Sequence, residues 1–152
     1  MVEVVESRTI EAPVALVWAA LADFEAISRW APNVDHSCLT TNAAGGLGAI
    51  RRVQSGRNTV LETVIDWVPE QRLAYSIAGL PPVIRSVTNA WKLDDLAGST
   101  VVTLTSTIDA GSRPPQKAVA RVVGRLLAKA SRQMLDGLDR HLHDQQPEKG
   151  VS

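Results

Sequence analysis

Two carboxylates could do chemistry in this sequence if the fold buries them. Glu62 and Asp66 lie in the segment 59–67, whose composition predicts a β-strand. Alternate strand residues share a face, so both side chains would project from the same side of a sheet. On a dry face their pKa values would rise, which suits general acid or base catalysis or the anchoring of a polar ligand. On a wet face, or paired with Arg51 or Arg85, they would have neither role.

Other patterns that commonly carry chemistry are missing. The segment Gly46-Leu47-Gly48 has Arg51 where a dinucleotide fingerprint needs its third glycine, and it precedes a strand rather than a helix. His141 and His143 would point to different sides of a helix, and the third histidine and the cysteine are distant, so no metal set emerges. There is no Gly-x-Ser-x-Gly elbow and no aromatic-rich basic strand. We therefore expect no metal, no cofactor and no nucleic-acid partner.

Composition predicts a single domain. The chain has 152 residues, 16 basic and 16 acidic side chains, and one cysteine, Cys38. This length allows a sizeable core, and the balanced charge implies no polyanionic partner. One cysteine rules out an internal disulfide and fits a reducing compartment. No apolar run is long enough for a membrane span, and the acidic N-terminus is unlike a signal peptide, so we expect a cytoplasmic protein without stable membrane insertion.

One stretch near the C-terminus organises the predicted fold. Pro114 and Pro115 suit a first helical turn, and apolar side chains then recur at spacings of three and four as far as residue 143. This pattern predicts a helix about 40 Å long, which needs an equally long apolar partner. The apolar positions are Val119, Val122, Val123, Leu126, Leu127, Ala130, Met134, Leu138 and Leu142.

The partner must be a sheet, because the remaining sequence predicts strands and short turns. Two short helices, near 13–23 and 25–30, follow the first strand. Hairpin links predict an α+β domain in which a curved seven-strand antiparallel sheet wraps around the long helix. The domain is expected to span 1–144, with a disordered tail at 145–152. The expected strands are 2–10, 37–41, 49–54, 59–67, 72–78, 84–93 and 100–108.

Four local motifs occur in a recognisable order. They are Pro13 with Val17-Trp18, the segment GLGAIRR at 46–52, the strand, proline turn and strand at 62–75, and the segment GSTVVTL at 98–104. In this order they resemble the START-like superfamily (SRPBCC), also called the helix-grip or Bet v 1-like fold. Within it, they are similar to the bacterial polyketide cyclase/dehydrase and lipid-transport family. The resemblance covers nearly the whole chain but indicates fold more than function.

This resemblance implies a hydrophobic cavity between the curved sheet and the long helix, gated by loops at 55–58 and 79–82. It turns the face of Glu62 and Asp66 toward the cavity, whereas composition alone would turn the opposite, more apolar face inward. The candidate ligand-binding residues are Trp30, Arg51, Val53, Glu62, Val64, Asp66, Tyr75, Ile77, Asn89, Trp91, Leu104, Val119, Val123 and Leu127.

Three functions are compatible with the sequence. The first is binding of a small hydrophobic ligand, such as a lipid, an isoprenoid or a polyketide-like molecule. The second is a polyketide cyclase, aromatase or dehydratase, with Glu62 and Tyr75 as candidate catalytic residues. The third is a toxin-like or co-chaperone-like interaction module. Binding needs only the cavity, whereas catalysis needs a specific constellation, so we favour a ligand-binding monomer or homodimer without enzymatic activity.

Overall fold

A seven-stranded antiparallel sheet dominates the computed structural model, which describes residues 2–42, 45–111 and 114–145. The strand order is β1-β7-β6-β5-β4-β3-β2, so all neighbours except β1 and β7 are consecutive in the sequence. The strands are β1 (Val2–Ile10), β2 (His36–Leu39), β3 (Ile50–Ser55), β4 (Asn58–Val68), β5 (Arg72–Ala78), β6 (Ser86–Asp95) and β7 (Thr100–Asp109).

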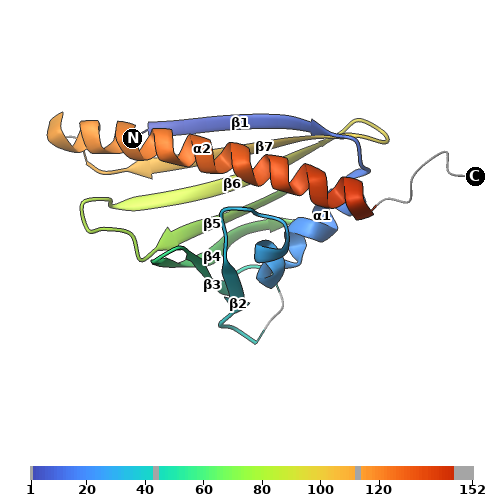
Figure 1. Cartoon of the computed structure of the whole chain (residues 1–152), viewed down its shortest axis with the longest axis horizontal. Helices are drawn as coiled ribbons and strands as arrows, with labels where there is room; N and C mark the ends of the chain where they lie inside the picture. The colour runs from blue at the N-terminus through green and yellow to red at the C-terminus, as the bar shows by residue number, and fades with distance from the viewer. Residues whose placement is uncertain (1, 43–44, 112–113, 146–152) are drawn as a thin grey trace, which may run out of the picture.

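Three helices lie against one face of the sheet, which we call the covered face (Figure 1). The helix α1 (Val14–Ala22) and the 3-10 helix η1 (Phe24–Arg29) follow β1, and α2 (Pro114–Gln145) follows β7. The long helix runs over β1 and β7 and contacts α1 near its C-terminal end (Figure 1). The predicted α+β arrangement of curved sheet, two short helices and long helix is confirmed.

The long helix extends slightly further than predicted. Gln145, which the sequence analysis placed in the disordered tail, is the last residue of α2. Its side-chain nitrogen lies 3.1 Å from Nε2 of His141, one turn earlier, and this contact supports the last turn. The rest of the predicted tail, 146–152, lies outside the described residues.

The apolar stripe of α2 is rotated relative to the prediction. Val122 and Leu126, expected to face the sheet, are 56% and 64% exposed. They lie two residues beyond Ala120 and Gly124, which is about 200° around a helix. Ala120 and Gly124 are buried and mark the true line of contact. Small residues on this line gave a weaker apolar signal than the larger side chains on the exposed side.

A β-bulge interrupts β4. Val64 pairs with Tyr75, but the next pair along the strands is Asp66 with Ala74. Ile65 is therefore an extra residue, and the alternation of faces along β4 is reversed after it.

The bulge corrects one predicted site residue. Glu62 precedes it and lies on the covered face, only 6% exposed, as the resemblance implied. Asp66 was predicted on the same face, but it lies beyond the bulge on the outer face, where it accepts a hydrogen bond from Arg72. Trp67 instead turns inward and packs edge to face against Trp18. The prediction assumed that side chains alternate strictly between the two faces of the strand, so it could not anticipate this reversal.

Buried side chains form two clusters beneath α2. The larger cluster lies under its C-terminal half and includes Phe24, Leu138 and Leu142. In the smaller cluster, under the N-terminal half, the helix contributes Val123 and Leu127, which are only partly buried. The helix therefore buries large side chains at its C-terminal end, whereas at its N-terminal end the fully buried residues are small. The buried members of the smaller cluster are Val87, Ile108, Ala110 and Ala120.

A glycine permits the tight packing. A Cβ atom at Gly137 would lie 2.1 Å from the backbone oxygen of Trp30, closer than any real contact. At Gly124, in the N-terminal half of α2, the nearest atoms would be the side-chain methyl groups of Val2 and Val4, at 3.2 and 3.4 Å. A side-chain methyl group can shift more easily than a backbone carbonyl. Gly124 should therefore tolerate an added side chain better than Gly137.

We expect Gly137→Ala to lower the free energy of unfolding by about 1–3 kcal/mol, because the new Cβ must push α2 away from Trp30. Alanine is more stable than glycine in a helix by about 1 kcal/mol, which opposes this loss. A net destabilisation would therefore show that the steric contact outweighs the helix preference. Gly124→Ala is the matched control and should change stability by less than about 1 kcal/mol. Equal denaturant-unfolding curves for the two variants would contradict the close contact.

Candidate functional site

A buried ion pair joins β3 and β4 on the covered face. Arg51 and Glu62 are directly opposed in the strand register, and Nε of Arg51 lies 2.7 Å from Oε1 of Glu62. Their side chains are only 3% and 8% exposed, so each must be neutralised by the protein rather than by water. Nη1 of Arg51 also donates to the backbone oxygen of Phe24 at 2.9 Å, which ties the two strands to η1.

Two aromatic rings hold the Arg51 guanidinium. Its central carbon lies 3.8 Å from the ring centroid of Phe24 and 4.7 Å from that of Tyr75. At such distances the negative ring faces attract a cation. Glu62 is therefore the partner of a fixed cation and not a free base. Of the alternatives considered from the sequence, pairing with Arg51 is the one observed for Glu62.

A chain of buried hydrogen bonds extends from Tyr75 across β5, β6 and β7. Nδ2 of Asn89 and Nε1 of Trp91 both donate to the Tyr75 hydroxyl oxygen, at 3.4 and 3.3 Å. The Ser106 hydroxyl donates to Oδ1 of Asn89 at 2.6 Å, which fixes the orientation of the amide. None of these four side chains is more than 3% exposed. These four side chains form a row of polar groups on a mostly apolar face, which we call the polar line.

Burial raises the pKa of Tyr75 above its ordinary value of 10.0. The Glu62 carboxylate raises this pKa further, whereas Arg51 and the hydrogen bonds from Trp91 and Asn89 lower it. The phenol is therefore neutral at physiological pH. Its oxygen already accepts two hydrogen bonds, and its own proton has no acceptor among the described side chains. The fully buried Tyr75 hydroxyl thus keeps one hydrogen-bond donor that no described side chain uses.

The structure places most of the predicted ligand-binding residues on the covered face, but in two clusters rather than at one site. Val119, Val123 and Leu127 of α2 are half-buried in its N-terminal half. Asp66 is the exception, since it lines an open depression of about 490 Å³ that also involves Arg72. The other predicted residues, buried or half-buried on the covered face, are Trp30, Arg51, Val53, Glu62, Val64, Tyr75, Ile77, Asn89, Trp91 and Leu104.

Two residues of the polar arrangement were not predicted. Ser106 follows Leu104 at a spacing of two on β7, so strand alternation alone would have turned it inward. Phe24 contributes both a carbonyl group and a ring to Arg51. It lies in a short 3-10 helix with a kink at Ala26, whose inner face has no periodic sequence signal.

Metal-ligating side chains are scattered over the part of the chain that the structure describes. No group of three or more His, Cys, Asp or Glu side chains within it could hold a metal ion. Among the same residues, no helix combines the length and the apolar character needed to cross a membrane. Cys38 is exposed and has no disulfide partner.

Comparison with known families agrees with this geometry. A family model described as polyketide cyclase / dehydrase and lipid transport matches residues 1–143. The matched segment contains the buried ion pair and the whole polar line. A comparison with curated proteins found no significant match.

Solved structures share the fold at low sequence identity. The Zhui aromatase/cyclase from Streptomyces sp. R1128 is 20% identical, with a TM-score of 0.80 over 99% of each chain. The di-domain ARO/CYC BexL from the BE-7585A biosynthetic pathway is 15% identical, with a TM-score of 0.78 over 94% of this chain and 47% of that chain. Ara h 8.0201 is 18% identical, with a TM-score of 0.71 over 94% of this chain and 98% of that chain. These similarities confirm the START-like, helix-grip arrangement.

Replacing Arg51 by methionine would leave the Glu62 carboxylate buried without a partner. We expect Arg51→Met to lower the free energy of unfolding by about 3–5 kcal/mol. The double variant Arg51→Met/Glu62→Leu should recover much of this loss, because no buried charge remains. As a control, Arg72→Met breaks the exposed pair with Asp66 and should cost less than about 1 kcal/mol. Equal losses for the two single variants in chemical denaturation would contradict a buried pair.

The single tyrosine makes the ionisation of Tyr75 directly measurable by the ultraviolet absorbance of tyrosinate. The unfolded chain should ionise near pH 10, and the folded protein only at higher pH. In that window the unfolded state has lost a proton that the folded state keeps, so the free energy of unfolding should fall as pH rises. Tyr75→Phe should remove this contribution. Tyrosinate in the folded protein below about pH 10 would contradict the raised pKa.

Proposed function

Because the chain belongs to the polyketide cyclase / dehydrase and lipid transport family, we propose that it binds a small, largely apolar molecule. The molecule would lie between the covered face of the sheet and the N-terminal half of α2. Two features support this location, an apolar wall that is only partly buried and a polar anchor beside it.

The N-terminal half of α2 supplies much of the apolar wall. Val119, Val123 and Leu127 are half-buried, and Val123 and Leu127 pack against the smaller buried cluster on the sheet. Ile77 on β5 and Leu80 in the following loop are also only partly buried in the same cluster. A molecule covering these side chains would remove apolar surface from water, which stabilises a complex by roughly 25 cal/mol per Å².

The unused proton of the buried Tyr75 hydroxyl is the observation that carries the proposal. Asn89 and Trp91 fix the position of the hydroxyl oxygen, so the remaining donor is oriented before a ligand arrives. Ile77 follows Tyr75 on the same face of β5, so the anchor adjoins the apolar wall. A ligand with one carbonyl or hydroxyl oxygen on an otherwise apolar body fits this arrangement.

Catalysis of the cyclase type is the second candidate. The Zhui protein and BexL are named as aromatase/cyclases, and in this chain Arg51 lies beside the Tyr75 ring. A fixed cation there could stabilise negative charge that develops on a ligand oxygen. However, Glu62 already pairs with Arg51, and the raised pKa makes Tyr75 a weaker acid than a free phenol. The geometry therefore favours binding and orienting a ligand over transferring a proton.

Adding bulk at Val123 tests the proposed binding region. Since Val123 is only partly buried, Val123→Trp should fold with a stability within about 1 kcal/mol of the parent protein but lose binding of a fluorescent hydrophobic probe. Val122→Trp is the matched control, because the same change one residue earlier falls on a side chain that is 56% exposed. This control should bind the probe as the parent does.

Fluorescence titration and denaturant unfolding together distinguish the outcomes. Probe binding that survives in a folded Val123→Trp protein would contradict the proposed region. A stability loss of about 1–3 kcal/mol in Val123→Trp would instead indicate overpacking of a filled core, and would also count against the proposal.

A further inference from the structure

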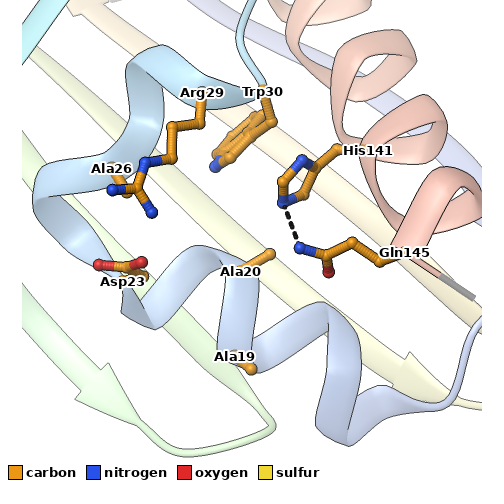
Figure 2. A pocket seen from close by; sticks show the side chains of 8 residues that line it. All are labelled: Ala19, Ala20, Asp23, Ala26, Arg29, Trp30, His141 and Gln145. Atoms are coloured by element: carbon orange, nitrogen blue, oxygen red, sulfur yellow. Dashed lines mark hydrogen bonds between the residues drawn. The ribbon is translucent and has the colours of Figure 1, made fainter.

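A separate pocket lies outside the covered face, between α1, η1 and the C-terminal end of α2 (Figure 2). Its volume is about 150 Å³, enough for about five water molecules or a small organic molecule. Residues from all three helices line it, so its shape depends on the tight packing around Gly137. It shares Trp30 with the core but none of the polar line from Tyr75 to Ser106.

A buried hydrogen-bond donor faces this pocket. Trp30 is only 7% exposed, and its ring packs edge to face against Trp91 with centroids 5.8 Å apart. Nε1 of Trp30 has no hydrogen-bond partner in the described structure, and Figure 2 shows it pointing into the space near Ala26 and Ala20. A buried N–H group without an acceptor is costly, which favours a bound group that supplies one.

Polar side chains surround the mouth of the pocket. Arg29 and Asp23 extend from η1 and the turn before it, and His141 and Gln145 come from the last turns of α2 (Figure 2). Neither Arg29 nor Asp23 takes part in an ion pair among the described residues. The Arg29 guanidinium is therefore available to an anion.

We propose that this pocket binds a short-chain monocarboxylate of about two to four carbon atoms. One carboxylate oxygen would accept from Nε1 of Trp30 and the other from the Arg29 guanidinium. The short alkyl part would contact the methyl groups of Ala20 and Ala26. Asp23 at the same mouth repels negative charge, which disfavours a dianion such as phosphate relative to a monoanion.

The indole N–H of Trp30 provides a direct readout. In a two-dimensional ¹H–¹⁵N spectrum, each of the four tryptophans gives one indole signal, and conventional backbone and side-chain assignment identifies that of Trp30. Titration with propionate should shift the Trp30 signal downfield in a saturable manner, with a dissociation constant of about 1–10 mM. The indole signals of Trp18, Trp67 and Trp91 should move little.

Two charge variants test the role of Arg29. Arg29→Gln should weaken propionate binding by roughly tenfold or more, because it removes a charge-assisted hydrogen bond. Arg57→Gln is the matched control, since Arg57 is an exposed arginine in the turn between β3 and β4, and it should leave binding unchanged. Both variants alter net charge equally, so a non-specific effect of charge would appear in both.

Three results would overturn the proposal. They are a Trp30 signal that does not move up to about 50 mM propionate, a shift of equal size with phosphate at matched ionic strength, and unchanged affinity in Arg29→Gln. The first would mean that only water occupies the pocket, and the second that the response is a general effect of anions. Because the pocket does not involve Val123 or Tyr75, none of these results depends on the function proposed above.

Discussion

The close contact between α2 and the end of η1 determines how the rest of the domain packs. With no side chain at Gly137, the helix reaches the backbone of Trp30, and Leu138 and Leu142 fill the core beside it. At the N-terminal half of α2, the small residues Ala120 and Gly124 are buried, and a Cβ at Gly124 would lie only 3.2 Å from Val2. The larger side chains of Val123 and Leu127 in this half are only partly buried.

The covered face combines this partly buried region with a buried charge that is almost fully satisfied. Arg51 is neutralised by Glu62, by a backbone carbonyl and by two ring faces. Such a pair contributes little net stability after desolvation, but it strongly disfavours any arrangement that separates its members. It therefore fixes the relative positions of β3, β4 and η1, and with them the position of the Tyr75 ring.

Family membership and fold leave the chemistry of the site open, because one fold can host different functions and the similar solved structures are only 15–20% identical to this chain. The distinguishing features are the charge and hydrogen-bond partners of individual side chains. Glu62 is paired, and Tyr75 is neutral with a donor to spare. A second buried donor, the Trp30 indole, faces a different pocket between α1, η1 and α2. Both binding proposals rest on these two unpaired donors.

The sequence by itself determined the element order, the antiparallel hairpins and the length of the C-terminal helix, because these depend on local periodicity and turn residues. Motif order further supplied the fold family and the inward face of Glu62. Only the tertiary structure decided that Asp66 turns outward after a bulge, that Val122 faces solvent, and that Phe24 closes over Arg51. The spacing of apolar residues along a segment indicates whether it forms a helix or a strand. Which face of that segment is buried depends on contacts with residues far away in the chain.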